Sequence, residues 1–333
     1  MSGRAELEQI HLATISEISR RSASERVRLI EEYQRRSEAA FAPTTRRNYV
    51  QIIAMFRGWC DEHGYDPTPP VSAGTVAAYI DHLGGKVRPT TIGVRLWAIN
   101  EMHRASFTLS PCKHRLVELA LMAVKRTYGA HIRQAAPLSK PEVIATIEKL
   151  GNSRIEMRDK ALLWIASDSW CRSSEIVAFR VRDLETQSDG SSLLFVARSK
   201  TDQYGEGAYA YLSRRGTDAA LAWIKLAGLG LDDPILTKSQ RGGQRTPLDP
   251  ATVSRIMKRR TGRRDVSAHS TRVGGVQDAF RLGCDLSSIM VAGRWNSPEM
   301  PARYGRRILA SQSAAAQVCA AFEETETGSG EHR

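Results

Sequence analysis

The strongest constraint on the fold is the spacing of apolar residues in the first half of the chain. Four successive segments carry apolar side chains at intervals of three and four residues, the spacing that places them on one face of an α-helix. Proline, serine or threonine stands where each segment begins, as is common at helix starts. The expected helix starts are Pro43, Ser72, Thr90 and Pro111. We therefore expect a four-helix domain over residues 41–128, preceded by an N-terminal helical extension over residues 1–40.

The pattern changes after residue 128. Residues 129–138 include Gly129 and Pro137 and lack helical spacing, so we expect an extended linker between two domains. Farther on, residues 193–198 and 208–212 have the composition of strands. They flank a polar loop, which predicts a β-hairpin with Lys200 near its tip.

The remaining segments of the second half again have helical spacing. They predict a second domain over residues 139–322, whose last helix occupies residues 311–322. The acidic tail at residues 323–333 is too polar to bury a core and is expected to be disordered. The predicted fold class is therefore mainly α, with two domains and a small β-sheet or hairpin in the second.

The charge of the chain predicts an anionic partner. Its formal net charge is +12, and the basic residues gather in two stretches. Residues 86–133 hold nine Lys and Arg against two acidic residues, and residues 241–264 hold eight against one. Because one such stretch falls in each half, we expect two surfaces that contact a single polyanion, and nucleic acid is the favoured partner.

Composition excludes several other classes of protein. No apolar run approaches the roughly 18 residues that a membrane span needs, and the N-terminus lacks the apolar core of a signal peptide. The five cysteines are scattered and never form a C-x-x-C pair, which argues against a disulfide framework and against a zinc site. These features predict a cytoplasmic protein without a metal.

The most informative motifs lie in the second domain. His269 and Arg272 are one helical turn apart, and they are followed by Trp295 and Tyr304, each beside an arginine. Three further polar residues precede this group, namely Arg172, Glu175 and Lys200. Together they supply the side chains needed to bind a phosphate group and to attack it with a phenol.

This set of residues resembles the active site of the tyrosine recombinases, also called the phage integrase family. The resemblance extends from about residue 44 to residue 322. The segments that carry it are CRSSEI at 171–176, RSKT at 198–201 and STRVG at 270–274. It implies a two-domain clamp on DNA, with the helical domain at 41–128 binding DNA and the domain at 139–322 performing catalysis.

Two departures from the commoner family pattern favour the Cre-type members. Many members have His at the positions of Trp295 and Val273. An indole can donate one N–H to a phosphate oxygen but cannot carry a proton in acid–base catalysis. The expected role of Trp295 is therefore binding and packing.

The resemblance implies a role for each residue in breaking a phosphodiester. Tyr304 is the expected nucleophile and would form a 3′-phosphotyrosyl link. Arg172 and Arg272 have planar donors that match the non-bridging phosphate oxygens, where charge builds in the transition state. His269 would take the tyrosine proton or share phosphate binding, because its ordinary pKa lies near neutrality.

The other two roles concern the leaving group and orientation. Lys200 would protonate the departing 5′-oxygen, and Glu175 would orient the arginine or the histidine. Residue type alone leaves Lys225 or Arg198 as rivals to Lys200. Tyr204, Tyr209 and Tyr211 are rivals to Tyr304, although they lack its arginine-flanked helical setting.

The family resemblance also implies the partners. The substrate would be double-stranded DNA with inverted-repeat arms, bound by a homotetramer on two sites, and no cofactor is required. An accessory protein remains an open possibility. The last helix offers a small apolar face for docking on a neighbouring protomer, formed by Ala314, Val318, Ala321 and Phe322.

Other surface residues are candidates for DNA contact because they are basic. They are Arg46, Arg47, Arg88, Arg95, Lys125, Arg126, Arg241, Arg245, Arg259 and Arg260. Two alternative functions stay open at this point. One is a type IB-like topoisomerase, which shares the chemistry, and the other is a DNA-binding regulator that retains the fold without turnover.

Overall fold

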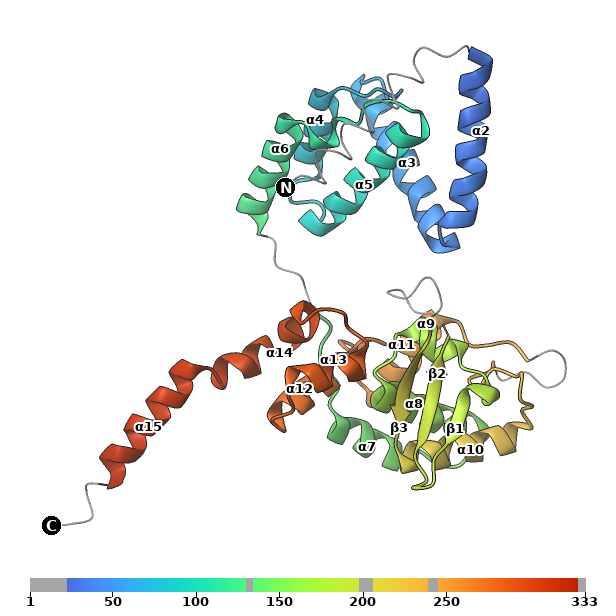
Figure 1. Ribbon diagram of the computed structural model, residues 1–333, viewed down its shortest axis with the longest axis vertical. Helices are drawn as coiled ribbons and strands as arrows, with labels where there is room; N and C mark the ends of the chain where they lie inside the picture. Colours follow the sequence, from blue (N-terminus) through green and yellow to red (C-terminus); the bar gives the residue numbers. More distant parts are fainter. Residues whose placement is uncertain (1–22, 130–133, 198–205, 239–244, 329–333) are drawn as a thin grey trace. The chain divides into compact units, whose positions relative to one another are not determined.

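The computed structural model describes residues 23–129, 134–197, 206–238 and 245–328 (Figure 1). Lys200 and Arg241 lie outside these ranges. The chain divides into two units, Met1–Arg133 and Gln134–Arg333. Among the described helices, none combines the length and the apolar character needed to span a membrane.

The first unit is built from helices alone within its described part. They are α2 (Ala23–Ala40), α3 (Pro43–His63), α4 (Ala73–Leu83), α5 (Pro89–Ala105), the short 3-10 helix η1 (Pro111–Lys113) and α6 (Arg115–Tyr128). Helix α3 begins at Pro43 as predicted, and the Ser72 hydroxyl accepts a hydrogen bond from the Thr75 amide to cap α4.

The fourth predicted helix begins later than the sequence indicated. Pro111 opens only η1, and the α-helix starts at Arg115 because the His114 side chain accepts the Leu116 amide at its N-terminus. The core of this unit consists of side chains from α3, α4, α5 and α6, together with Val71 before α4. Its most deeply buried members include Phe56, Ile80, Ile92 and Ile99.

The second unit surrounds a small sheet with helices. Its helices are α7 (Lys140–Glu148), α8 (Arg154–Ser169), α9 (Ser173–Ala178), η2 (Val181–Asp183), α10 (Arg214–Ala227), α11 (Pro250–Thr261), α12 (Ser270–Arg281), α13 (Leu286–Gly293), α14 (Glu299–Ser311) and α15 (Ala314–Gly328). Its strands are β1 (Leu184–Thr186), β2 (Ser192–Val196) and β3 (Ala208–Leu212). The mainly α fold class with a small sheet is thereby confirmed.

The sheet is antiparallel in the order β1-β2-β3. The predicted hairpin corresponds to β2 and β3, with Leu194 opposite Ala210, and the three-residue strand β1 is added to its edge. The side chains of Leu194, Ala210 and Leu212 are buried, so one face of the hairpin joins the core. The alternation along β2 and β3 therefore fixes which face is buried.

Helix α8 runs through the main core of the second unit. Leu162, Leu163 and Ile165 are completely buried there, against α10 and β3. The helix begins at Arg154. The reason is a capping box, in which Ser153 accepts the Glu156 amide and the Glu156 carboxylate accepts the Ser153 amide.

A smaller core joins α12, α13 and α14 and supports the functional side chains. Val273, Phe280 and Ile289 are buried in it. Gly305 lets α14 approach α12, because a Cβ at this position would lie 2.3 Å from the Phe280 ring. Helix α15 continues to Gly328, six residues beyond the predicted end of the last helix.

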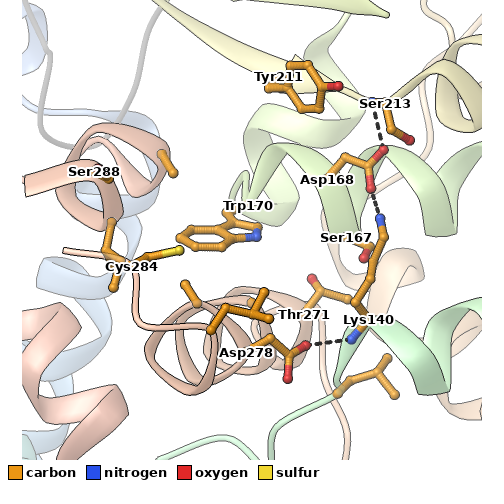
Figure 2. A pocket seen from close by; sticks show the side chains of 16 residues that line it. Lys140, Ser167, Asp168, Trp170, Tyr211, Ser213, Thr271, Asp278, Cys284 and Ser288 are labelled. Atoms are coloured by element: carbon orange, nitrogen blue, oxygen red, sulfur yellow. Dashed lines mark hydrogen bonds and ion pairs between the residues drawn. The ribbon is translucent and has the colours of Figure 1, made fainter. Parts of the chain in front are cut away.

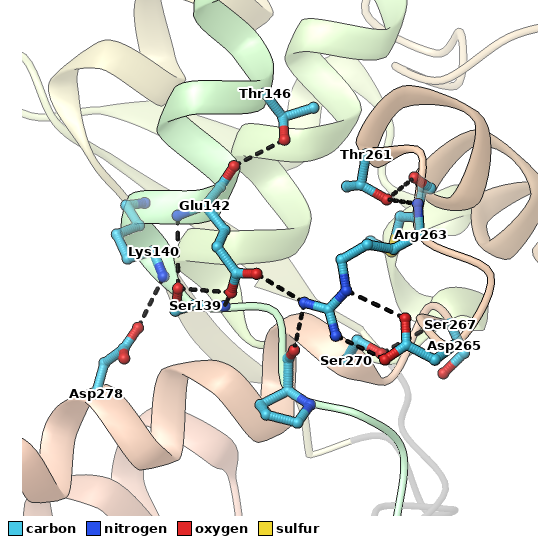
Figure 3. Close-up of polar contacts among 12 residues, drawn as sticks. Ser139, Lys140, Glu142, Thr146, Thr261, Arg263, Asp265, Ser267, Ser270 and Asp278 are labelled. Atoms are coloured by element: carbon cyan, nitrogen blue, oxygen red, sulfur yellow. Dashed lines mark hydrogen bonds and ion pairs between the residues drawn. The ribbon is translucent and has the colours of Figure 1, made fainter.

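The last residues of the predicted linker are fastened to the second unit. Leu138 is buried, and its amide donates to the Ser270 carbonyl over 3.0 Å. Arg263 donates to the Pro137 carbonyl at 3.1 Å and to the Glu142 carboxylate at 2.7 Å. Figure 3 shows Arg263 pointing toward Glu142. The chain is thus fixed at the N-terminal ends of α7 and α12 just before the first helix of the second unit.

Candidate active site

Four segments distant in sequence bring the predicted residues together. His269 immediately precedes α12, Arg272 lies in its first turn, Trp295 follows α13, and Tyr304 lies on α14. Arg172 caps α9, and Glu175 lies in the first turn of that helix. Contacts join His269, Arg272, Trp295 and Tyr304 in one group and Arg172 with Glu175 in another, and Arg294 and Trp170 connect the two groups. Lys200 lies outside the described residues.

Tyr304 is seated between the two other aromatic groups of the site. Its hydroxyl lies 2.5 Å from Nε2 of His269, and its ring meets the Trp295 ring edge-on with centroids 5.9 Å apart. The side chain is only 6% exposed, and burial raises the pKa of the phenol. Nucleophilic use of this hydroxyl therefore requires a group that accepts its proton.

The backbone of Tyr304 is held as firmly as its side chain. Its carbonyl accepts a hydrogen bond from Gln277 on α12 at 3.1 Å and another from Gln134 at 3.4 Å. Because α14 is also packed closely on α12 at Gly305, the hydroxyl is carried on a rigid element.

His269 is placed to accept the proton of Tyr304. Burial, followed by the charges of Arg272 and Arg172, lowers the pKa of His269 to about 4. The imidazole is therefore neutral near pH 7, and an unprotonated Nε2 can accept the phenolic proton. An anionic phosphate placed between the arginines would favour the protonated form and raise this pKa.

The pKa of His269 predicts a loss of stability in acid. The folded protein binds fewer protons than the unfolded chain between about pH 6.5 and about pH 4, so stability from this residue is lost as the pH falls through that window. When the pH is lowered from about 7 to about 5, we expect the free energy of unfolding of the parent protein to fall by about 1–2 kcal/mol more than that of the His269→Gln variant. Urea unfolding of both proteins at the two pH values measures this difference, and equal losses would contradict it.

Arg272 is almost completely buried, at 1% exposure. Its guanidinium donates to the Trp170 carbonyl at 2.7 Å and to the Gly293 carbonyl, and it stacks over the Trp295 ring at 4.3 Å. Burial, with the charges of Arg172 and Arg294, lowers its pKa to about 10, so the group stays charged near neutrality. Two backbone carbonyls and one indole thus fix the direction of this guanidinium.

Arg172 and Glu175 form the other half of the site. The Glu175 carboxylate accepts the Arg172 amide at 2.9 Å and the Arg172 guanidinium at 2.8 Å. Burial alone would raise the pKa of Glu175, but the hydrogen bonds and charge of Arg172, with the charge of Arg294, lower it. The i, i+3 spacing therefore corresponds to a real pair, in which Glu175 holds the arginine side chain in place.

Sequence reasoning assigned no role to Arg294, the arginine that stands beside Trp295. Its guanidinium is 3.2 Å from the Glu175 carboxylate, at the oxygen that also accepts the Arg172 amide. The local sequence suggests an exposed arginine after a helix, and nothing in the spacing indicates a partner 119 residues away. Trp170 was also missed, and its carbonyl accepts from Arg272.

The basic residues predicted to contact DNA in the first unit are mostly exposed. Arg46 and Arg47 lie in the first turn of α3, Arg88 precedes α5, and Lys125 and Arg126 lie in the last turn of α6. Arg95 is half-buried and donates to the Tyr79 hydroxyl at 2.9 Å.

Among the basic candidates in the second unit, the three that the structure describes have internal partners. Arg245 donates to the Ala227 carbonyl at 2.9 Å. Arg259 and Arg260 on α11 both contact the carboxylate of Asp159, which is completely buried, at 2.9 Å and 2.7 Å. Arg259 is still 57% exposed, so it retains a surface for another anion.

Comparison with known proteins is consistent with this site. No model of a known protein family matches the chain. It is 29% identical to an integrase/recombinase XerD homolog of Selenomonas ruminantium over 83% of this chain and 85% of the homolog. It is 25% identical to the Cre recombinase of Escherichia phage P1, over 82% of this chain and 87% of that protein.

Solved structures show the same fold. The integrase of the Tn1549 transposon, in complex with transposon right end DNA, matches with a TM-score of 0.60 at 11% identity and covers 83% of this chain and 93% of the integrase. The predicted resemblance is thereby confirmed. Two recombinases thus align with most of this chain, and the described residues predicted from the resemblance gather around one buried tyrosine, so the chain is similar to the tyrosine recombinases, a family of site-specific recombinases.

Proposed function

We propose that this chain cleaves and rejoins duplex DNA at sites with inverted-repeat arms, through a 3′-phosphotyrosyl intermediate. The observation that carries the proposal is the 2.5 Å contact between the Tyr304 hydroxyl and the neutral imidazole of His269. Two guanidinium groups, on Arg172 and Arg272, lie close enough to this pair for their charges to lower the pKa of His269. A phenol, a base and several phosphate-binding donors are the requirements of this reaction.

The positions of these groups support the following steps. His269 accepts the proton as the Tyr304 oxygen attacks the phosphorus, and the arginines bind the non-bridging oxygens, where negative charge increases. The bond to the 5′-oxygen then breaks, and we assign its protonation to Lys200. Attack by the 5′-hydroxyl of a second strand reverses these steps and releases Tyr304, so the bond energy is conserved without a nucleotide cofactor.

Double-stranded DNA is the proposed substrate for two further reasons. The chain has a net charge of +12, with one basic stretch in each half. The Tn1549 integrase, whose fold it shares, is bound to DNA in its solved structure. An excess of positive charge in two regions favours a long polyanion over a small phosphate ester.

A covalent trapping experiment tests the function. The protein is mixed with nicked fragments of the DNA of its source organism and denatured, and the DNA that stays attached is sequenced. Attached fragments that share an inverted repeat are the expected result. Attachment without a common sequence would favour a topoisomerase, and tight binding without attachment would favour a regulator.

We also propose assembly into a tetramer through α15. Val318 is 56% exposed and Phe322 is 71% exposed, so this helix presents apolar area at its own surface. A pocket of about 460 Å³ elsewhere in the second unit is lined by apolar side chains around Trp170, with Cys284 and Ser288 on one side and Lys140 and Asp168 on the other (Figure 2). An apolar helix face and an apolar pocket on each copy would make a heterologous contact that closes into a ring.

Removal of α15 is expected to separate binding from assembly. The cut is best placed after Ser313, because α14 continues to Ser311 and Leu309 packs in the smaller core. The shortened protein should bind a single site with unchanged affinity but should fail to bring two sites together in a native gel. Val318→Glu is the matched point variant. Synapsis by both variants at the parent level would refute the proposed contact.

A further inference from the structure

Arg294 has a backbone conformation that does not suit its side chain. It ends α13 with φ 53° and ψ 50°, which is the left-handed region that glycine adopts without strain. Its amide still completes the helix end by donating to the Met290 and Val291 carbonyls. A glycine would therefore satisfy the helix, and the presence of an arginine indicates a use for the side chain.

The side chain of Arg294 is buried, at 9% exposure. Its guanidinium donates to the Ser169 carbonyl at 3.1 Å and to Sγ of Cys171 at 3.2 Å, both at the C-terminal end of α8. Its Nε lacks a hydrogen-bond partner among the described residues. A buried charge with an unsatisfied donor is costly unless an opposite charge compensates for it.

The compensating charge is Glu175, whose side chain is 2% exposed. One of its carboxylate oxygens accepts the Arg172 guanidinium at 2.8 Å, and the other accepts the Arg172 amide at 2.9 Å and Arg294 at 3.2 Å. The carboxylate therefore lies between two arginines. Arg172 is the more exposed of the two, at 22% against 9%, and is the one open to a ligand.

We propose that Arg294 is a positioning residue, which locks the Glu175 carboxylate and thereby aims the guanidinium of Arg172 at the scissile phosphate. This proposal rests on the proposed function. With Arg294 in place, Glu175 cannot rotate away from Arg172 without leaving a buried guanidinium unpaired. The charge of Arg294 also contributes, after burial and Arg172, to the lowered pKa of Arg272, so it adds to the positive potential of the site.

The decisive variant is Arg294→Gly, which relieves the backbone strain while it removes the guanidinium. We expect its thermal unfolding temperature and its affinity for the cleavage site to stay close to those of the parent. Its single-turnover cleavage rate on a nicked site should fall roughly 10- to 100-fold, as is typical when a group that orients a catalytic ligand is lost. Arg294→Lys, which keeps the charge without the planar fork, should recover part of the rate.

A double-mutant cycle separates positioning from a general structural role. Glu175→Gln should slow cleavage by itself, and adding Arg294→Gly to it should cause little further loss, because both changes release the same arginine. Arg182→Ala serves as the matched control, because Arg182 pairs with Asp232 on the surface, at 58% and 78% exposure. This control should cleave at the parent rate.

Several outcomes would overturn the proposal. One is an Arg294→Gly variant that cleaves at the parent rate. Another is a double variant whose cleavage rate falls by the full product of the losses in Arg294→Gly and Glu175→Gln. If Arg294→Gly does not fold, Arg294→Lys decides, because a parent-level rate in that variant would exclude any need for the guanidinium geometry. If the parent protein itself cleaves no DNA, that result contradicts the proposed function. A parent protein that cleaves DNA at the same rate as Arg294→Gly contradicts only the positioning role of Arg294.

Discussion

Replacement of Tyr304 by Phe is expected to abolish covalent attachment to DNA while the affinity for DNA is retained. The change removes one oxygen from a side chain that is 6% exposed and packed edge-on against Trp295 and His269, so the shape of the site is preserved. Because no other described tyrosine has its hydroxyl on His269, the cleavage rate should fall by at least about 10⁴-fold. Denaturing gels of the protein with a labelled, nicked site measure the attachment, and a filter-binding titration measures the affinity.

The controls for this experiment are two tyrosines on strand β3. Tyr209 and Tyr211 are 58% and 54% exposed, and they lie near the hairpin loop. Tyr209→Phe and Tyr211→Phe should both cleave at the parent rate. Attachment that persists in Tyr304→Phe, or that disappears in one of these two variants, would assign the nucleophile to another residue.

Replacement of Asp159 by Ala is expected to destabilise the second unit severely. Asp159 is completely buried and compensates three arginines, with Arg158 at 2.8 Å, Arg259 at 2.9 Å and Arg260 at 2.7 Å. Arg158 is itself buried at 7% exposure, so removal of the carboxylate leaves a charge that has lost its partner inside the protein. We expect a loss of about 3–5 kcal/mol in the free energy of unfolding, measured by urea denaturation.

The contrast with an exposed carboxylate sharpens this prediction. Asp232 pairs with Arg182 on the surface, and its replacement by Ala should cost less than about 1 kcal/mol. Asp159→Asn keeps the shape of the side chain but removes its charge. Its loss in the free energy of unfolding should be closer to that of Asp159→Ala than to that of Asp232→Ala. A small loss for both Asp159 variants would show that water or rearranged side chains compensate the three arginines.

The helices were predictable where local chemistry determines their ends. Pro43 and Ser72 mark the starts of α3 and α4 because a fixed φ angle and a capping hydroxyl act within one turn. Strand β1 was not predicted, because its three residues exist only through pairing with β2. The start of α6 was misplaced because His114, an uncommon cap, competes with Pro111 four residues before the helix.

The site was predictable as a set of residues but not as a geometry. Arg172 and Glu175 lie one turn apart, so their pairing follows from sequence spacing. The contact between His269 and Tyr304 spans 35 residues and depends on how α14 packs against α12, which no local pattern specifies. Arg294 and Asp159 are further from their partners, at separations of 119 and 100 residues, and they were identified only after the chain was folded.

Tyr304 is held by residues of its own subunit, and this determines which subunit cuts each DNA strand in an assembly. Its hydroxyl already contacts His269, and its carbonyl is held by Gln277, both from the same chain. Each protomer would therefore carry its own nucleophile and the base beside it, and would depend on no neighbour for either. In an assembly that mixes intact subunits with Tyr304→Phe subunits, the number of nicks per complex would equal the number of intact tyrosines, so every nick would report the subunit that made it.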